Sequence, residues 1–324
     1  MTGIVANGPR VGRRQLLKWS GMAGVTLIAG QGCPALAQAQ KLEQMKIFIG
    51  SNPSFGSIMI ADEKGFFEGE GLPVQVTKFA SGSTAIDAFR AGRGDLVCAG
   101  DLPSLRLWEK GGVALCPEAN YGELNVLVAK KTITKPADLE GKKLGTIIGS
   151  TSEYLARRYL ASGGVDYKRV QIINLTPAGM VTGLVRGDID AFTCFQPFGW
   201  RAIKADPDAR IVTATAPFFR EWLLVNTTPE YAKAHNREII AFLKALNKSA
   251  NWIPEHLDEA TQIIAKSLGM DDRDTVKMML KVIDWNVSST KKLRTDMEQL
   301  GKFFHVSVNW NKSFDGRFLA RLKA

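Results

Sequence analysis

The chain has 324 residues, of which 45% are hydrophobic and 23% are charged. That composition is typical of folded soluble proteins, and the length suffices for two domains of ordinary size. The net charge is +10, and it is +6 without the N-terminal segment, which has no acid and contains four basic residues, Arg10, Arg13, Arg14 and Lys18. This small excess of positive charge suits anionic ligands weakly. Zinc-finger spacings, RNP motifs and basic helices are absent from the sequence, so we expect no nucleic-acid partner.

Residues 1–37 are expected to form an export signal rather than part of the fold. The run G-R-R-Q-L-L-K at 12–18 resembles the twin-arginine motif, a mildly apolar stretch follows, and an A-x-A site predicts cleavage after Ala37. We therefore expect a periplasmic protein that begins at Gln38. A basic, disordered N-terminus is the alternative. Lipidation of Cys33 is a lesser one, because the G-Q-G before it is a poor lipobox.

The mature chain is expected to begin with an apolar strand at 45–49. A loop at 50–56 follows and contains Asn52 and Phe55, which makes both candidates for a site at the end of the strand. A helix then runs from Ile58 to near Gly65, and an alternating strand covers 74–79.

A polar turn opens the next helix, which Gly92 ends, and a short strand at 96–99 leads to Asp101. Backbone N–H groups at a helix start lack intrahelical partners and favour an anion. The turn therefore predicts either an anion site or a helix cap. Its residues are Ser81, Gly82, Ser83 and Thr84. Asp101 stands where open α/β sheets place ligands, and it either contacts the ligand or orients a loop.

A second copy of this unit follows a strand at 143–148. The pattern F-x-x-G-x-x-D at 89–95 recurs as L-x-x-G-x-x-D at 184–190, and the second polar turn contains Ser150, Thr151 and Ser152. Two such units predict two similar lobes, with a polar helix start from each facing one cleft. Glu153 stands in capping-box register with Ser150, and such a box would occupy donors that an anion needs.

Strands alternate with helices as far as about residue 195, which predicts an α/β fold with mainly parallel sheets. The chain is expected to change lobe twice, which gives lobe 1 as 38–128 with 224–324 and lobe 2 as 129–223. The C-terminal helices are expected to pack back on lobe 1. Gln196 follows a strand of lobe 2 and Trp222 lies near the return crossing, so both are candidate ligand contacts.

Catalytic and metal-binding patterns are missing from the sequence. His235, His256 and His305 have no partner at metal-ligand or triad spacing, and there is no Walker A motif and no G-x-G-x-x-G. We therefore expect no enzyme activity, no cofactor and no metal. Cysteines without C-x-x-C spacing indicate neither a metal site nor a disulfide framework. They are Cys33, Cys98, Cys116 and Cys194.

These features together resemble the periplasmic substrate-binding proteins of ABC transporters, in the group that binds aliphatic sulfonates, taurine and nitrate. The resemblance rests on the repeated pattern, the export signal and the runs G-D-L-P at 100–103, A-D-L-E-G-K-K at 137–143 and L-T-P-A at 175–178. It implies a two-lobed, type II binding-protein fold that closes on a small organic anion. It also implies a permease and its ATPase as partners, and we expect a monomer.

By the same resemblance, the candidate ligand contacts lie in the cleft, and Trp222 is added from its place near the crossing. The set is Asn52, Phe55, Ser81, Gly82, Ser83, Thr84, Asp101, Ser150, Thr151, Ser152, Gln196 and Trp222. The run C-F-Q-P at 194–197 departs from the family's aromatic–acidic–proline run, and a neutral glutamine there suits a different headgroup. An aliphatic sulfonate is the main expectation. Nitrate, bicarbonate, a thiamine or pyrimidine precursor, and an enzyme on the same fold remain alternatives.

Overall fold

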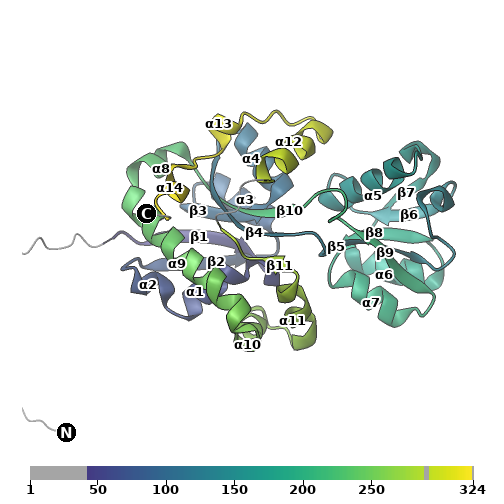
Figure 1. Ribbon diagram of the computed structural model, residues 1–324, viewed down its shortest axis with the longest axis horizontal. Helices are drawn as coiled ribbons and strands as arrows, with labels where there is room; N and C mark the ends of the chain where they lie inside the picture. Colours follow the sequence, from purple (N-terminus) through teal and green to yellow (C-terminus); the bar gives the residue numbers. More distant parts are fainter. Residues whose placement is uncertain (1–41, 288–291, 323–324) are drawn as a thin grey trace, which may run out of the picture. The chain divides into compact units, whose positions relative to one another are not determined.

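The computed structural model describes residues 42–287 and 292–322, which fall within one compact unit. The expected export signal and Cys33 lie outside these residues. The described chain forms two β-sheets with helices around each of them (Figure 1). No helix in these two ranges is long and apolar enough to cross a membrane.

The first sheet has six strands in the order β11-β4-β10-β3-β1-β2. They are β1 (Met45–Gly50), β2 (Val74–Phe79), β3 (Leu96–Gly100), β4 (Val113–Tyr121), β10 (Glu221–Thr227) and β11 (Ile283–Asp284). β1 pairs in parallel with β2 and β3, whereas β10 runs antiparallel to β3 and β4, and β11 runs antiparallel to β4. The apolar residues predicted as the first strand form β1, and Met45, Ile47 and Ile49 are fully buried.

The second sheet has five strands in the order β7-β6-β8-β5-β9. They are β5 (Asn125–Lys130), β6 (Lys143–Thr146), β7 (Gln171–Asn174), β8 (Ala191–Phe195) and β9 (Ala209–Ala214). β6 pairs in parallel with β7 and β8, and β5 runs antiparallel to β8 and β9. The α/β prediction is confirmed.

Both sheets are mixed, which corrects the expectation that they are mainly parallel. In the first sheet, the chain returns from the second sheet as β10, which lies between β3 and β4 and runs against both. In the second sheet, β5 is likewise inserted between β8 and β9. The alternation of apolar residues marks a strand but not its direction, so the sequence carried no sign of these antiparallel insertions.

By strand membership, the chain changes sheet between Tyr121 and Asn125 and again between Ala214 and Glu221. Both changes come somewhat before the expected crossings at 129 and 223. The residues predicted to end lobe 1 therefore begin the second sheet as β5. The division into lobes itself remains a proposal.

Among the described residues, eleven helices lie in the parts of the chain that form the first sheet, before β5 or after β10. They are α1 (Gly56–Glu63), α2 (Phe66–Gly69), α3 (Gly82–Arg90), α4 (Asp101–Glu109), α8 (Pro229–Ala234), α9 (Asn236–Glu255), α10 (Leu257–Leu268), α11 (Arg273–Lys281), α12 (Leu293–Phe303), α13 (Trp310–Ser313) and α14 (Arg317–Ala320). The second sheet has α5 (Thr151–Ser162), α6 (Pro177–Arg186) and α7 (Phe198–Ala205). Short 3-10 helices occur at Pro53–Phe55, Pro136–Leu139 and Tyr167–Arg169.

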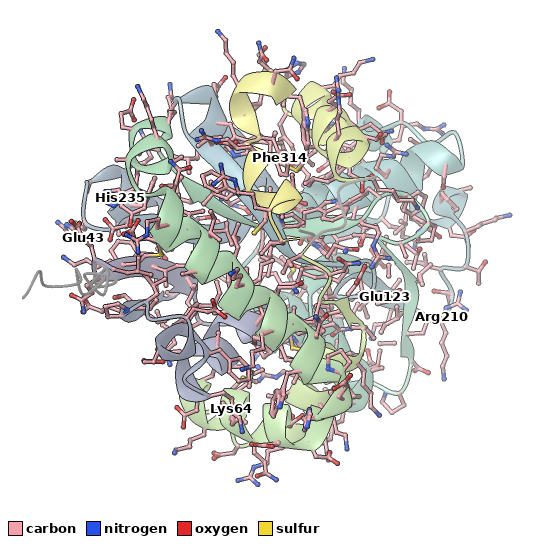
Figure 2. All side chains as sticks on the ribbon, turned by 60° about the vertical axis from the view of Figure 1, so that its left-hand side comes forward. Glu43, Lys64, Glu123, Arg210, His235 and Phe314 are labelled. Carbon is pink, nitrogen blue, oxygen red and sulfur yellow. The ribbon has the colours of Figure 1, made fainter. Side chains whose placement is uncertain are left out.

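The C-terminal helices pack back on the first sheet, as expected. The rings of Phe67 in α2 and Phe242 in α9 stack with their centroids 5.3 Å apart. Lys64, the residue that follows α1, is labelled in Figure 2. Its ammonium lies 4.9 Å from the ring centroid of Trp252 in α9. These contacts join α9 to the same core that buries β1.

The repeated pattern found in the sequence has a structural cause. Asp95 accepts a hydrogen bond from the Lys46 amide at 2.7 Å, where β1 begins, and Asp190 accepts one from the Lys143 amide at 2.9 Å, where β6 begins. Each aspartate thus ties a helix–strand joint to the neighbouring parallel strand. The glycine of each copy has a positive φ, 72° at Gly92 and 80° at Gly187, and ends its helix.

Candidate ligand-binding cavity

A cavity of about 440 Å³ is lined by residues attached to both sheets. Nine of the twelve candidate residues lie in its wall, so the structure gathers segments that are far apart in the sequence. These residues are Asn52, Phe55, Ser81, Gly82, Ser83, Ser150, Thr151, Ser152 and Gln196. The starts of α3 and α5 therefore meet at one cavity, as the repeated unit predicted.

The start of α3 combines a helix cap with free amides. Ser81 Oγ accepts from the Thr84 amide at 3.2 Å and Thr84 Oγ1 accepts from the Ser81 amide at 3.0 Å, which is a complete capping box. The amides of Gly82 and Ser83 have no hydrogen-bond partner within the described residues. Gly82 also permits a close approach to β3, because a Cβ there would lie 3.2 Å from the Cα of Ala99. Two amides and the Ser83 hydroxyl thus remain for a ligand.

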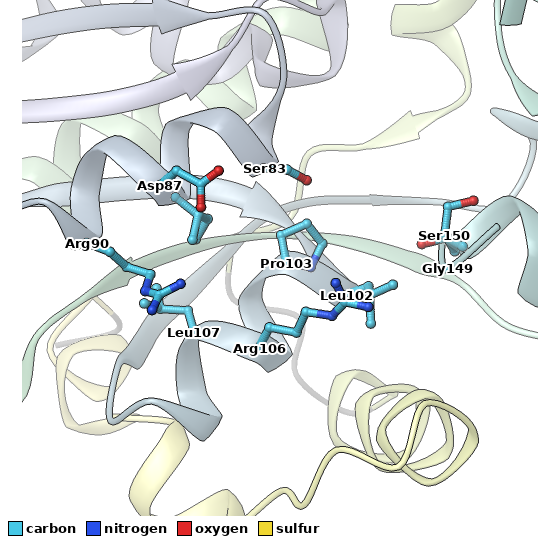
Figure 3. A pocket seen from close by; sticks show the side chains of 11 residues that line it. Ser83, Asp87, Arg90, Leu102, Pro103, Arg106, Leu107, Gly149 and Ser150 are labelled. Atoms are coloured by element: carbon cyan, nitrogen blue, oxygen red, sulfur yellow. The ribbon is translucent and has the colours of Figure 1, made fainter. Parts of the chain in front are cut away.

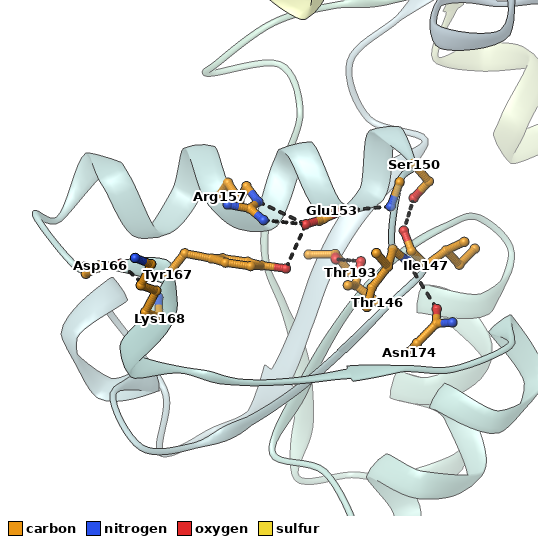
Figure 4. Close-up of polar contacts among 12 residues, drawn as sticks. Thr146, Ile147, Ser150, Glu153, Arg157, Asp166, Tyr167, Lys168, Asn174 and Thr193 are labelled. Carbon is orange, nitrogen blue, oxygen red and sulfur yellow. Dashed lines mark hydrogen bonds and ion pairs between the residues drawn. The ribbon is translucent and has the colours of Figure 1, made fainter. Parts of the chain in front are cut away.

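The start of α5 leaves its amides free in another way (Figure 4). Ser150 Oγ donates to the Ile147 carbonyl at 2.5 Å instead of accepting from the helix, and the Glu153 carboxylate accepts from the Gly149 amide at 2.7 Å. Neither bond of the expected capping box is therefore formed, since Glu153 accepts from the Gly149 amide and not from the Ser150 amide. No partner within the described chain takes the amides of Thr151, Ser152 and Glu153.

Glu153 is held in its ionised form. Burial alone would raise its pKa, but the Gly149 amide, Arg157 and the Tyr167 hydroxyl outweigh burial and hold the pKa of Glu153 below its ordinary value. Arg157 Nη2 lies 2.8 Å and Tyr167 Oη lies 3.1 Å from Glu153 Oε1 (Figure 4). The carboxylate thereby fixes the turn that precedes α5.

Two candidates, Thr84 and Asp101, lie outside the cavity wall. The Thr84 hydroxyl donates to the Ser81 carbonyl at 2.8 Å while accepting from the Ser81 amide, so the cap uses both of its functions. Asp101 is buried, accepts from the Leu102 amide at 2.7 Å and accepts from Thr151 Oγ1 at 3.1 Å. Asp101 thus orients the start of α5, in agreement with the loop-orienting alternative.

Trp222 also lies outside the wall, while its neighbours Glu221 and Leu223 line the cavity. Successive side chains of a strand point to opposite faces of the sheet, and Trp222 takes the other face of β10. There its Nε1 donates to Asp296 Oδ2 at 2.9 Å within an aromatic-rich core. Trp222 therefore faces away from the cavity, while Glu221 of the same strand lines it.

Asn52 and Gln196 lie in the wall, yet their side-chain oxygens are already engaged. Asn52 Oδ1 accepts from the amide and the hydroxyl of Ser54, at 2.9 and 2.8 Å. Gln196 Oε1 accepts from the Trp200 amide at 3.0 Å, and the Gln196–Pro197 peptide bond is cis. Each therefore presents its amide nitrogen, a donor, as the remaining polar group of its side chain.

Several polar and charged residues of the cavity wall were not predicted from the sequence. Among them are Tyr121, Asn125, Glu221 and Arg201. Arg201 and Glu221 are the only cation and the only acid in the wall formed by described residues. A glutamate that opens an otherwise apolar strand, as in E-W-L-L-V, is the signal that would have identified Glu221. Phe195, Phe198 and Met279 add an apolar surface to the wall.

Burial is the largest influence on the pKa values of two acids near the cavity, Asp101 and Glu221. It raises the pKa of Asp101 to about 6, against hydrogen bonds from Leu102, Thr151 and Trp222 that lower it. Burial, and then the neighbouring Asp101, raise the pKa of Glu221 well above its ordinary value, while the nearby side chains of Asn125 and Thr215 oppose the shift. Both acids thus resist carrying a negative charge, and an unneutralised pair of charges is disfavoured.

A second cavity of about 430 Å³ adjoins the first and shares Ser83, Ser150 and Thr151 with it (Figure 3). Arg90 and Arg106 line it together with a single acid, Asp87. Two arginines beside the polar helix starts make this side electropositive, which favours the approach of an anion.

Within the described residues, the cavity has neither a metal-binding cluster nor a histidine in its wall. The described part of the chain contains no group of three or more His, Cys, Asp or Glu side chains that is placed to hold a metal ion. The wall includes no histidine. Cys98, Cys116 and Cys194 are free and buried.

Comparison with known proteins identifies relatives of the chain. A family model described as NMT1/THI5 like matches residues 52–260. A Bacillus subtilis protein provisionally named as an aliphatic sulfonates-binding protein is 27% identical over 273 residues, covering 80% of each chain. The taurine-binding periplasmic protein of Escherichia coli is 29% identical over 193 residues, covering 56% of this chain and 57% of that one.

The fold is also found among solved structures. The crystal structure of the periplasmic aliphatic sulphonate binding protein SsuA from Escherichia coli matches with a TM-score of 0.72 at 18% identity. The match covers 81% of this chain and 92% of that one. It supports the same arrangement of two mixed sheets with flanking helices.

Proposed function

Because the chain belongs to the NMT1/THI5-like family, we propose that it is the solute-binding component of an ABC importer for a small organic anion such as an aliphatic sulfonate. One observation carries this proposal. Two helix starts, one beside each sheet, bring free backbone amides to a single cavity. Amides at a helix start point outward and the helix dipole adds positive potential, so this pair of ends favours an anion.

A sulfonate matches these donors chemically. It is a permanent anion with three acceptor oxygens, so it accepts bonds from the Gly82 and Ser83 amides and from α5 at the same time. Each hydrogen bond to a charged group contributes about 1.5–3 kcal/mol, and each helix end adds about 0.3–1 kcal/mol. A few such bonds supply the roughly 8 kcal/mol of a micromolar complex.

The apolar part of the wall favours an alkyl-bearing ligand over nitrate or bicarbonate. Phe195, Phe198 and Met279 contribute to it, and a short alkyl chain gains about 0.8 kcal/mol for each CH₂ group it buries. Nitrate and bicarbonate have no such group. This surface is the reason to prefer a sulfonate among the anions that the helix starts accept.

The two sheets are proposed to act as two lobes that close on the ligand. Residues up to Tyr121 and from Glu221 onward form the first lobe, and 125–214 form the second, following strand membership. A ligand bound to α3 and α5 together stabilises the closed arrangement, because only that arrangement offers both sets of donors.

Export and delivery complete the proposal. The twin-arginine signal at 1–37 directs the chain to the periplasm and is cleaved after Ala37. The closed monomer delivers the anion to a permease and its ATPase. Binding occurs without chemical change of the ligand.

Calorimetric titration of residues 38–324 tests this function. We expect micromolar binding of at least one short alkane- or aminoalkanesulfonate, and no measurable heat with nitrate or bicarbonate at the same concentrations. Ligand recovered after prolonged incubation is expected to be unchanged by mass spectrometry. A preference for nitrate, an absence of sulfonate binding or conversion of the ligand would each contradict the proposal.

A further inference from the structure

Glu221 is a buried acid with one carboxylate oxygen that is unpaired within the described residues. It opens β10, its side chain is buried with 8% of the residue exposed, and it lines the cavity. Oε1 has no hydrogen-bond partner within the described residues, and Oε2 accepts one long bond from Asn125 Nδ2, at 3.4 Å. Buried polar atoms in native proteins are nearly always satisfied, so the free oxygen points to a group that the ligand supplies.

We propose that Glu221 binds an amino group of the ligand, so that the protein's ligand is a zwitterion that carries an ammonium group as well as an anionic head. This inference rests on the proposed function and specifies its ligand class. The anionic head binds the starts of α3 and α5, and the ammonium donates to Glu221. An ammonium has three N–H donors and no acceptor, which complements a carboxylate with an unused oxygen.

The surroundings of Glu221 offer it no cation. Tyr121 stands directly opposite in the β4–β10 register, Asn125 and Thr215 contribute neutral groups, and Asp101 is a second acid nearby. Arg201, the one cation in the described wall, forms no ion pair with Glu221. A cationic group of the ligand therefore supplies the positive charge that the surrounding residues do not provide. It also relieves the repulsion between Glu221 and Asp101.

A chain of hydrogen bonds links Glu221 to the anion-binding end of the cavity. Ser152 Oγ, in the first turn of α5, donates to Asn125 Oδ1 at 3.1 Å, and Asn125 Nδ2 donates to Glu221. The residue next to Ser152, Thr151, bonds to Asp101. The first turn of α5 thus connects to both acids, which places the proposed ammonium and anion subsites in one polar network.

The competing possibility is that Glu221 is protonated and donates to the anionic head itself. The two possibilities differ in the ligand that they favour. A carboxylate subsite prefers an ammonium over a methyl group at the end of the ligand, whereas a neutral carboxyl donor shows no such preference. The two possibilities also differ in whether binding releases a proton. The pKa of Glu221 is raised in the free protein, so pairing of the carboxylate with an ammonium releases the proton that Glu221 holds.

Paired isosteres test the subsite. 2-Aminoethanesulfonate and propane-1-sulfonate differ by ammonium against methyl, and 3-aminopropanesulfonate with butane-1-sulfonate repeats the comparison at a longer reach. We expect the wild-type protein to bind the better amino ligand at least about tenfold more tightly than its methyl isostere. Glu221→Gln is expected to remove that preference while changing the affinity for the alkanesulfonate by less than about twofold.

Glu123→Gln is the matched control, since Glu123 is an exposed acid in the loop after β4 and is not in the cavity wall. It is expected to bind every ligand as the wild type does. Calorimetry of the amino ligand in two buffers of different ionisation enthalpy is expected to show proton release from the wild type and none from Glu221→Gln.

Equal affinity for each isosteric pair, or an unchanged preference in Glu221→Gln, would overturn the ammonium subsite while leaving sulfonate binding intact. Binding of neither member of either pair would instead contradict the proposed function, and with it the inference. Thermal melts of each variant exclude misfolding as the cause of a lost preference.

Discussion

Two neighbouring hydroxyls at the start of α3 have different physical roles. The Ser83 hydroxyl lines the cavity and has no hydrogen-bond partner within the described residues, whereas the Thr84 hydroxyl is fully used by the capping box. Sequence alone treats the two alike, because Ser and Thr serve equally as caps and as ligand donors. The structure separates them through the direction in which each side chain leaves the first turn.

Alanine variants are expected to separate stability from affinity at these two positions. Ser83→Ala removes a donor to the anion and should weaken sulfonate binding by about tenfold, with little change in melting temperature. Thr84→Ala removes the Thr84 side-chain bond of the capping box, while Ser81 still caps the helix, and should cost up to about 1 kcal/mol of stability while leaving affinity nearly unchanged. Calorimetric titration beside thermal melts measures both quantities. Reversal of the two patterns would show that Thr84, rather than Ser83, contacts the ligand.

At the scale of elements, the start of α5 depends on a buried carboxylate. Glu153 joins the Gly149 amide to Arg157 and Tyr167, so one side chain holds the turn, the helix and the segment that follows it. Because Glu153 occupies the Gly149 amide rather than an amide within the helix, the first amides of α5 stay available. The first amides of α5 thus remain available to an anion, as do the Gly82 and Ser83 amides beside the complete capping box of α3.

Glu153→Gln is expected to lower stability by about 2 kcal/mol at neutral pH, since hydrogen bonds to a charged group are lost. The pKa of Glu153 is held below its ordinary value, so its contribution is present above that value and disappears as the pH falls through the lowered pKa. The gap between wild type and variant should therefore close below about pH 4. Urea denaturation across this pH range measures it. A gap that persists or widens in acid would contradict this account.

Local patterns predicted the elements well and their long-range pairing poorly. The apolar run of β1 and the glycine stops at Gly92 and Gly187 depend on near neighbours, and each is found in the structure. The antiparallel insertion of β10 depends on partners over a hundred residues away, for which the sequence of the strand carries no signal.

The candidate site shows the same limit. Polar turns at helix starts are visible in sequence, and those residues do gather at one cavity. The face of a strand is fixed only by its register, so the sequence does not show that Glu221 rather than Trp222 faces the cavity. Glu221 and Asn125 become site residues only because β5 and β10, from different sheets, bring them together.

At the scale of the whole molecule, the proposed function requires that one ligand contacts both sheets. Hydrogen bonds from Thr151 to Asp101 and from Asn125 to Glu221 already join residues of the two sheets around the cavity. In the proposed complex, a bound anion adds further bonds to α3 and α5 at once. Its binding energy is therefore gained in full only when the two lobes are closed on it.

Small-angle scattering of residues 38–324, with and without saturating 2-aminoethanesulfonate or propane-1-sulfonate, tests this central claim most directly. Saturation is established beforehand by calorimetry on the same sample. The account predicts a smaller radius of gyration in the presence of the ligand, and a weaker contraction at the same concentration for Ser83→Ala. An unchanged scattering profile at proven saturation would contradict capture of the anion between two closing lobes.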